Sequence, residues 1–265
     1  MSAPELIDTH CHLNFTSYAD DRMEVLARAS DAGVKLIIIP AIDLPSCNQA
    51  IELAGQHDGV YAAVGVHPNS CGEFAQSHVD ELRAFSRHQD IVAIGEIGLD
   101  YYWDKCPKPT QHSALEAQLE LAADLELPVI LHNREAASDL MAILEAWAPQ
   151  TASSLRGRLG ALHSFSASLE TAQRAIDLGF FIGFTGPVTY KKADELRAIA
   201  TSLPQDRIII ETDGPFLAPQ ERRGKRNEPA YLPFINRKLA ELHGVSAEEM
   251  AQRTTANAKR LFALL

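Results

Sequence analysis

Eight short apolar runs alternate with stretches of helical periodicity along this chain of 265 residues. Runs that are apolar throughout are typical of strands buried on both faces of a parallel sheet. The predicted strands are the segment around Leu6 and Ile7 and residues 35–40, 60–66, 91–95, 128–131, 159–162, 180–184 and 207–210. The predicted helices are residues 20–33, 46–56, 74–88, 111–125, 135–147, 169–178, 193–203, 230–243 and 247–262. This alternation predicts a parallel (β/α)₈ TIM-type barrel.

The length and the turns agree with that interpretation. Barrels of this class commonly contain about 250 residues in one unit. The alternative, a doubly wound open sheet, usually carries a Gly-x-Gly-x-x-Gly turn after its first strand, and we find none there. No low-complexity linker or shift of composition divides the chain. We therefore predict a single domain over residues 1–265.

Polar residues are concentrated where the predicted strands end. His10 and His12 stand two residues apart, so in an extended strand their imidazoles project from the same face. Because the C-terminal ends of all strands of a parallel barrel meet on one face, we expect these side chains to share one cavity. The strand-end set consists of His10, His12, His67, His132, His163, Glu96 and Asp213.

Each of these residues also has a structural interpretation when it is taken alone. A single histidine at a strand end is more often a hydrogen-bonded structural residue than a ligand. Glu96 could cap the loop that follows it, and Asp213 could cap the next turn. However, buried carboxylates and imidazoles are costly unless they are paired or bind a metal. Seven such groups at separately predicted strand ends favour a metal centre.

The residue types restrict the metal and its number. Mixed imidazole and carboxylate ligands suit zinc, manganese or iron, whereas all-oxygen shells favour magnesium or calcium. Six candidate ligands exceed one tetrahedral site with an open position, so two bridged ions fit the count better. Glu96 is our choice for the bridge. Such a pair can generate hydroxide near neutral pH, which indicates hydrolytic chemistry.

Seven short motifs contain these residues. They are Asp8-Thr9-His10-Cys11-His12, Gly65-Val66-His67-Pro68, Gly95-Glu96-Ile97-Gly98-Leu99-Asp100-Tyr101, Leu131-His132-Asn133-Arg134, Leu162-His163-Ser164-Phe165, Glu211-Thr212-Asp213 and Arg223-Gly224-Lys225-Arg226-Asn227-Glu228-Pro229. Together they resemble the TatD family of metal-dependent hydrolases, within the amidohydrolase-like barrels, over nearly the whole chain. The resemblance implies a (β/α)₈ barrel with two divalent metal ions held at His10, His12, Glu96, His132, His163 and Asp213.

The resemblance also implies deoxyribonuclease activity, usually that of a metal-dependent 3′→5′ exonuclease acting on single-stranded ends. We expect Glu96 and Asp213 to hold a water that the metal pair (zinc, magnesium or manganese) activates, with Asp213 as general base. His67 and Arg134 match positions expected to contact the substrate phosphate. A structural alternative for Arg134 is an ion pair with Glu96 or Glu135.

A nucleic-acid substrate has to be attracted locally, because the net charge of −11 opposes bulk attraction of a polyanion. The loop Arg222–Arg226 is the only dense basic cluster and follows the strand that ends at Asp213. We expect Arg223, Lys225 and Asn227 to contact the substrate; the alternative is a solvated surface loop. Residues 101–103 (Tyr-Tyr-Trp) could stack on bases or pack within their own loop.

The sequence also suggests a compartment. Its four cysteines are widely spaced and form no Cys-x-x-Cys pair, which favours free thiols in a reducing environment. The first five residues lack the pattern of a signal peptide, and no apolar run approaches the roughly 18 residues of a membrane span. We expect a cytoplasmic protein without membrane contact. The oligomeric state is not fixed by the sequence, and a monomer is favoured.

Two alternatives to a nuclease remain open. The chain departs from the family pattern at Ser164, Ser166, Glu135 and Gly214, none of them a proposed ligand, and this leaves the substrate open. A lactonase, phosphotriesterase or cyclic amidohydrolase could use the same scaffold, but many of these bridge their metals with a carbamylated lysine, and no lysine ends a predicted strand. A metal-stabilised binding module is the non-enzymatic alternative, and the surplus of ligands argues against it.

Overall fold

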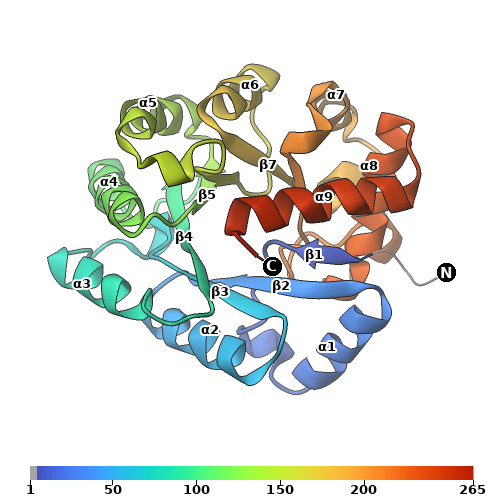
Figure 1. Ribbon diagram of the computed structural model, residues 1–265, viewed down its shortest axis with the longest axis horizontal. Coiled ribbons are helices and arrows are strands. Elements are labelled where there is room, and N and C mark those ends of the chain that lie inside the picture. Colours follow the sequence, from blue (N-terminus) through green and yellow to red (C-terminus); the bar gives the residue numbers. More distant parts are fainter. Residues whose placement is uncertain (1–4, 265) are drawn as a thin grey trace.

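The structure of the protein is a computed structural model that describes residues 5–264. Residues 1–4 and residue 265 lie outside the described residues. The expectation that the chain lacks a signal peptide depends on the first of these segments. Eight parallel strands form one sheet in the order β1 to β8, surrounded by helices (Figure 1). The strands are β1 (Leu6–Asp8), β2 (Val34–Pro40), β3 (Val60–Val64), β4 (Ile91–Asp100), β5 (Val129–Arg134), β6 (Gly160–Leu162), β7 (Phe180–Phe184) and β8 (Ile208–Ile210). The predicted barrel is confirmed as a single domain.

The helices alternate with these strands as predicted. They are α1 (Arg22–Asp31), α2 (Leu44–Gln56), α3 (Gln76–Phe85), α4 (Lys108–Leu125), α5 (Ala137–Trp147), α6 (Leu169–Leu178), α7 (Asp194–Ser202), α8 (Leu232–His243) and α9 (Ala247–Phe262). Each lies outside the sheet except α9, which crosses one end of the barrel (Figure 1). No helix of the described residues is both long enough and apolar enough to cross a membrane.

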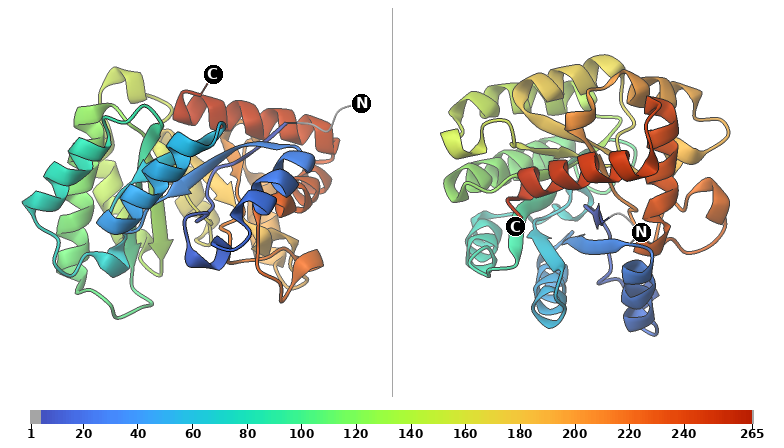
Figure 2. Two further views of the ribbon diagram at one scale, coloured as in Figure 1. Left: turned by 90° about the horizontal axis from the view of Figure 1, so that it is seen from below. Right: turned by 45° about the vertical axis from the view of Figure 1, so that its right-hand side comes forward.

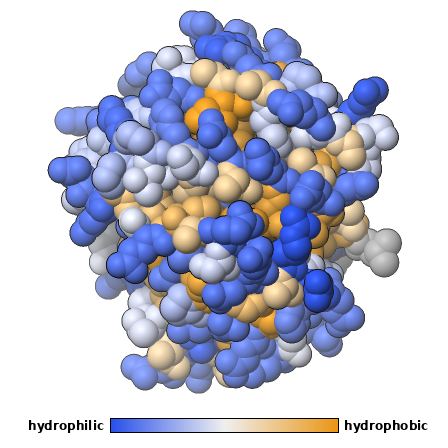
Figure 3. Space-filling view, turned by 90° about the vertical axis from the view of Figure 1, so that its left-hand side faces the viewer, coloured by the Kyte–Doolittle hydropathy of each residue, from blue (hydrophilic) through white to orange (hydrophobic). Residues whose placement is uncertain are grey.

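Local sequence signals set the limits of these helices. Before α6, the hydroxyl of Ser168 accepts a hydrogen bond from the Thr171 backbone N–H, and α6 ends at Gly179, whose φ of 105° suits glycine. Within α6, Ala172 and Ala175 face the sheet and are buried. The outer surface around α3, α4 and α5 is mostly hydrophilic, with apolar side chains in patches (Figure 3). Helices that cover a sheet are amphipathic in this way, with an apolar face toward the sheet and a mostly polar face toward the solvent.

The barrel closes between its first and last strands with few backbone contacts. The Thr9 N–H donates to the Ile210 carbonyl at 3.3 Å, and the Asp213 N–H donates to the His10 carbonyl at 2.8 Å. Cys11 and Gly214 form an isolated parallel bridge just beyond the strands. The seam therefore runs through the segments that carry His10 and Asp213.

The barrel interior is apolar at the end where the strands begin. Its buried residues come from all eight strands and from α9: Ile7, Ile38, Ala63, Val92, Ala93, Ile130, Ala161, Phe181, Ile209, Ala258, Leu261 and Phe262. Helix α9 covers this end (Figure 2, left). The opposite end, where the strands point, is left for the polar residues. A second and larger apolar cluster fills the layer between the sheet and the helices.

Two strands are longer than predicted. The sequence suggested that β4 ends before Glu96 and β5 before His132, because polar residues begin there. In the structure β4 continues to Asp100 and β5 to Arg134, since Gly98 pairs with His132 and Asp100 with Arg134. The register shifts between Ile94 and Ile97, so Glu96 lies at an irregularity inside its strand. Irregularities of this kind re-aim a side chain, here toward the barrel axis.

Candidate metal centre

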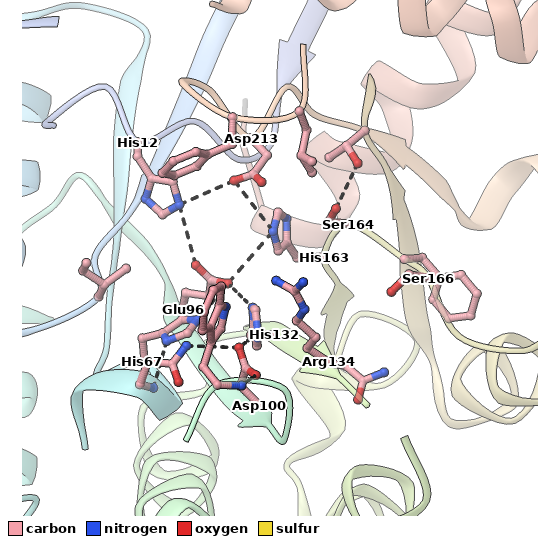
Figure 4. Close-up of a pocket in the computed structure, with 18 of the residues that line it drawn as sticks. His12, His67, Glu96, Asp100, His132, Arg134, His163, Ser164, Ser166 and Asp213 are labelled. Carbon is pink, nitrogen blue, oxygen red and sulfur yellow. Dashed lines mark hydrogen bonds and ion pairs between the residues drawn. The ribbon is translucent and has the colours of Figure 1, made fainter. Parts of the chain in front are cut away.

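A pocket of about 770 Å³ opens where the strands end. Every strand, or the loop after it, contributes to the wall; in chain order the contributions include His12, Ile42, His67, Glu96, His132, His163, Thr185 and Asp213. Glu96 lies in the middle of the labelled side chains, with imidazoles on several sides (Figure 4). Of the seven strand-end residues that were expected to converge, all except His10 line this one cavity. No lysine is among its lining residues in the described part of the chain.

One oxygen of Glu96 and one of Asp213 face the two histidines that follow β1. His10 Nε2 lies 3.4 Å from Glu96 Oε2 and 3.7 Å from Asp213 Oδ1. His12 Nε2 lies 3.7 Å and 3.5 Å from the same two oxygens, and 3.3 Å from His10 Nε2. These four atoms form a compact set, which we call the first ligand group.

The other oxygen of Glu96 faces three more imidazoles. Glu96 Oε1 lies 2.9 Å from His132 Nδ1, 3.7 Å from His67 Nε2 and 3.9 Å from His163 Nε2. His163 Nε2 is also 3.9 Å from Asp213 Oδ1. These atoms are the second ligand group. The Glu96 carboxylate thus stands between two groups, with one oxygen turned to each.

The spacing within these groups fits a divalent cation. Ligand atoms bound at roughly 2.1 Å around a tetrahedral zinc ion are about 3.4 Å apart. The five separations measured in the first ligand group, from 3.3 to 3.7 Å, match that value. Two buried sets of potential ligands involve these residues, namely His10, His12 and Glu96, and His10, His163 and Glu211; a third set, His67, Glu96 and His132, has both histidines half-buried. The donor set is the imidazole and carboxylate mixture that borderline metals prefer.

The two carboxylates are ionised in this environment. Burial would raise the pKa of Glu96, but its electrostatic interactions with His67 and His10 and its hydrogen bonds with His10 and His132 hold the pKa well below its usual value. Burial also opposes ionisation of Asp213, yet the hydrogen bond from His12 and the charge of His163 lower its pKa. A pair of negative charges is therefore held in a buried site, and a cation stabilises such a pair.

Two further carboxylates orient the histidines. His163 Nδ1 lies 2.9 Å from Glu211 Oε1; burial lowers the pKa of His163, but the Glu211 carboxylate raises it to about 10. His132 Nε2 lies 3.0 Å from Asp100 Oδ2, which also accepts a hydrogen bond from the Asn69 side chain. A carboxylate behind a ligating histidine fixes its ring and tautomer.

Glu211 and Asp100 were not among the residues predicted to form the site. A signal was present in each case, because Glu211 precedes Asp213 by two residues and Asp100 follows Glu96 by four. Even spacing along an extended segment keeps side chains on one face. Glu211 also needs space that the neighbouring strand provides: a Cβ on Gly183 would lie 2.5 Å from Glu211 Oε1.

The segment that carries Asp213 is held by the first strand. Asp8 accepts hydrogen bonds from the Thr212 backbone N–H at 2.9 Å and from the Thr212 hydroxyl at 2.5 Å. Burial raises the pKa of Asp8 to about 7, although these hydrogen bonds oppose the rise. Asp213 itself has a φ of 55°, a left-handed conformation that non-glycine residues rarely adopt. Such conformations persist where the surrounding contacts fix them, and they are frequent at functional sites.

His67 and Arg134 both line the pocket. The guanidinium of Arg134 lies 3.9 Å from the centre of the Tyr102 ring, and no carboxylate of residues 5–264 lies within 4.0 Å of it. The alternative ion pair with Glu96 or Glu135 is thus not formed. Tyr101 is half-buried and hydrogen-bonded to Asp139, so it faces away from the pocket side of its loop.

Within residues 5–264, four of the five exposed large apolar residues lie around the pocket mouth. Trp103, Phe216 and Leu217 line it with exposed fractions of 47%, 52% and 36%, and Tyr102, which stacks on Arg134, is 49% exposed. Trp103 follows β4, whereas Phe216 and Leu217 follow β8. The mouth therefore has apolar walls on two sides, with the ligand groups below them.

The loop Arg222–Arg226, which we call the basic loop, does not line this pocket. Its residues were expected to contact the substrate. Arg223 stacks on Tyr190, and Lys225 lines a different hollow, described below. Asn227 is fully buried: its amide donates to the carbonyls of Thr212 and Phe216, and its oxygen accepts from the Glu228 N–H. Asn227 thus positions the segment around Asp213 and has no free side-chain atom for a ligand.

Comparison with known proteins identifies similar chains. A family model described as TatD related DNase matches residues 7–263. An uncharacterized metal-dependent hydrolase of Bacillus subtilis, YabD, is 40% identical over 257 residues, which cover 97% of this chain and 98% of that protein. A protein of Erwinia tasmaniensis named 3′-5′ ssDNA/RNA exonuclease TatD is 37% identical over 265 residues, covering 98% of this chain and 100% of its own. The crystal structure of YjjV, a TatD homologue from Escherichia coli K12, superposes with a TM-score of 0.90 at 34% identity over 98% of each chain.

Proposed function

Because this chain belongs to the family of TatD-related DNases, which are metal-dependent hydrolases, we propose that it cleaves phosphodiester bonds of single-stranded nucleic acid, most readily as a 3′→5′ deoxyribonuclease. The observation that carries the proposal is the position of Glu96, whose two oxygens face two separate groups of imidazoles. A relative with 37% identity is named as a nuclease of this polarity, which supports the choice of substrate.

The proposed cofactor is a pair of divalent ions, zinc, magnesium or manganese. His10, His12, Glu96 and Asp213 would hold one, and His132 and His163 with Glu96 the other. Ions in such sites lower the pKa of water to near neutrality and neutralise charge that develops on a phosphate. The remaining chemistry belongs to side chains of the protein.

Asp213 is the proposed proton acceptor. Its side chain is 13% exposed, compared with 4% for Glu96, so it is the carboxylate that reaches furthest into the pocket. It is ionised, as a general base must be. We propose that Asp213 takes the proton of an attacking water while Glu96, more deeply buried, keeps both ligand groups in place.

Arg134 and His67 are the proposed contacts for the substrate phosphate. The planar guanidinium of Arg134 can offer two parallel N–H groups to phosphate oxygens. Its stacking on Tyr102 holds it at the wall without occupying its donors. His67 Nδ1 accepts the Asn69 N–H at 3.0 Å, which orients Nε2 toward the cavity.

The apolar walls support an unpaired substrate. Trp103 and Phe216 present exposed rings at the mouth, and aromatic rings bind bases of a single strand by stacking, at about 1–3 kcal/mol per base. The two strands of a duplex hide these faces within their own stack. The proposal includes a cytoplasmic location, which rests on the interpretation of the four cysteines as free thiols.

The test is a cleavage assay with 3′- and 5′-labelled single-stranded DNA, run with each of the three metals and with chelator. We expect nucleotides to be released from the 3′ end, with duplex DNA and RNA cut more slowly. A panel of lactones and phosphotriesters serves as the comparison substrate. Turnover of that panel without any release of nucleotides would contradict the proposal and would favour the alternative hydrolase class.

A further inference from the structure

A second hollow, of about 660 Å³, lies beside the loop that follows Asp213. It is lined by Arg28, Arg222, Lys225, Glu228, Ala230, Tyr231, Pro233, Phe234 and Arg237, and we call it the basic hollow. Its lining residues come from α1, from the loop after β8 and from the start of α8. It shares no lining residue with the pocket of the metal centre.

The charges of the basic hollow are unbalanced. The one lining carboxylate, Glu228, is occupied, because Arg28 pairs with it at 2.6 Å; Arg226, in the same loop, pairs with Asp21 at 2.7 Å. A further three cations, Arg222, Lys225 and Arg237, have no carboxylate of the described residues within 4.0 Å. Four lining cations against one lining carboxylate leave three positive charges on a chain whose net charge is −11.

Aromatic rings lie among these cations. The guanidinium of Arg222 is 5.3 Å from the Tyr231 ring centre and 5.4 Å from that of Phe234, and Arg237 is 4.8 Å from Phe234. Unpaired cations beside aromatic rings are the combination that binds a single nucleic-acid strand, through its phosphates and its base faces.

The loop that lines the basic hollow is joined by a hydrogen bond to a residue of the metal-centre pocket. Asn227, two residues after Lys225, donates a hydrogen bond to the Phe216 carbonyl at 2.7 Å, and Phe216 lines that pocket. Residues two apart in a chain have Cα atoms within about 7 Å of each other. Lys225 is therefore near Phe216 in space, and a single strand held at the metal centre needs only a few more nucleotides to span the distance to it.

We propose that the basic hollow binds the phosphates of the same single strand, a few nucleotides from its reacting end. This inference rests on the proposed function. It predicts that the protein prefers strands of several nucleotides to dinucleotides, because only longer strands reach both sites.

The experiment compares the triple variant Arg222→Gln/Lys225→Gln/Arg237→Gln with the control Lys35→Gln/Arg87→Gln/Arg156→Gln, which removes the same charge from exposed positions near the opposite end of the barrel. Lys225→Gln alone serves as a variant with minimal risk to folding, since that side chain is exposed. Hydrolysis is measured on a dinucleotide and on a 12-nucleotide single strand. Binding of the 12-nucleotide strand is measured in chelator at several salt concentrations.

We expect the triple variant to lower kcat/KM for the 12-nucleotide strand about tenfold and to leave the dinucleotide unchanged. The slope of log K against log salt should fall by about 2, at roughly 0.7 per lost contact. Equal losses on both substrates, no loss on the longer one, or an equal loss in the control would overturn the inference. Equal competition by polyglutamate would also overturn it, as a sign of unspecific charge. If the wild type hydrolyses neither substrate, the proposed function fails, while the binding measurement in chelator still tests the basic hollow.

Discussion

The two ends of this barrel are built from the same eight strands and differ in what they bury. Where the strands begin, Ile7, Ile38, Phe181 and Ile209 pack against Leu261 and Phe262 of α9. Where the strands end, His10 and Glu96 are buried to a similar degree but are polar. Apolar burial stabilises a fold directly, at about 25 cal/mol per Å². Buried charges add little net stability and need partners on every side. One end should therefore determine stability and the other activity.

The largest effect should follow from Glu96→Gln. The substitution keeps the shape of the side chain but removes the charge that both ligand groups face. We expect nuclease activity to fall about 10³-fold or more, since metal-assisted activation of water contributes several kcal/mol to such reactions. Circular dichroism should show an intact barrel. Glu120→Gln, an exposed position on α4, is the control. If Glu96→Gln cleaved the substrate as fast as the wild type, the assignment of activity to the polar end of the barrel would be wrong.

The reciprocal change is Phe262→Ala at the apolar end. Phe262 is 3% exposed and packs inside the barrel. Truncation of a buried phenylalanine usually destabilises a protein by about 3–5 kcal/mol. We expect urea denaturation to show that loss, with activity per folded molecule unchanged. Phe262→Leu should lose much less. A variant that stays as stable as the wild type but loses activity would show that the two ends are coupled.

Glu211→Gln should have an intermediate effect at the polar end. Glu211 accepts hydrogen bonds from the Ser164 N–H and the Thr9 hydroxyl and faces His163 Nδ1. Loss of a carboxylate behind a ligating histidine typically weakens metal affinity or activity by about 10–100-fold. Metal titration followed by calorimetry measures this. Glu221→Gln, an exposed acid in the loop after β8, should bind metal as the wild type does.

The smallest effect concerns a charge outside the cavity. Hydrogen bonds from Arg226 and Arg28 hold the pKa of Asp21 at about 2. A carboxyl group whose pKa is lowered by folding stabilises the folded state at pH values above its unfolded-state pKa, near 4. This stabilisation is lost as the pH falls through the folded-state pKa of about 2. Because this pair is partly exposed, Asp21→Asn should destabilise the protein by less than about 1 kcal/mol at pH 7. Urea titrations at several pH values measure the free energy of unfolding of both proteins, and the difference between them should vanish by pH 2. A difference that stays constant with pH would show that the substitution acts through packing and not through charge.

The strands could be predicted because each contains a run of buried apolar residues. The first ligand group could be predicted because its members follow strands whose C-terminal ends meet on one face of the barrel. The true ends of β4 and β5 could not be predicted, since the pairing of Gly98 with His132 depends on a neighbouring strand that one chain segment does not specify. The position of the loop Arg222–Arg226 away from the pocket could not be predicted either, because it also depends on contacts with distant segments. This loop lies in a long connection between β8 and α8, and the direction of such a loop depends on contacts like that of Asn227 with Phe216.

The seam between β1 and β8 has a consequence for synthesis of the protein. His10 and His12 emerge from the ribosome among the first residues, yet Asp213 and the Thr212 hydroxyl that grips Asp8 come some two hundred residues later. No nascent chain shorter than this can assemble the first ligand group. A hydrolase that needs this group therefore gains its metal site only when translation has nearly finished.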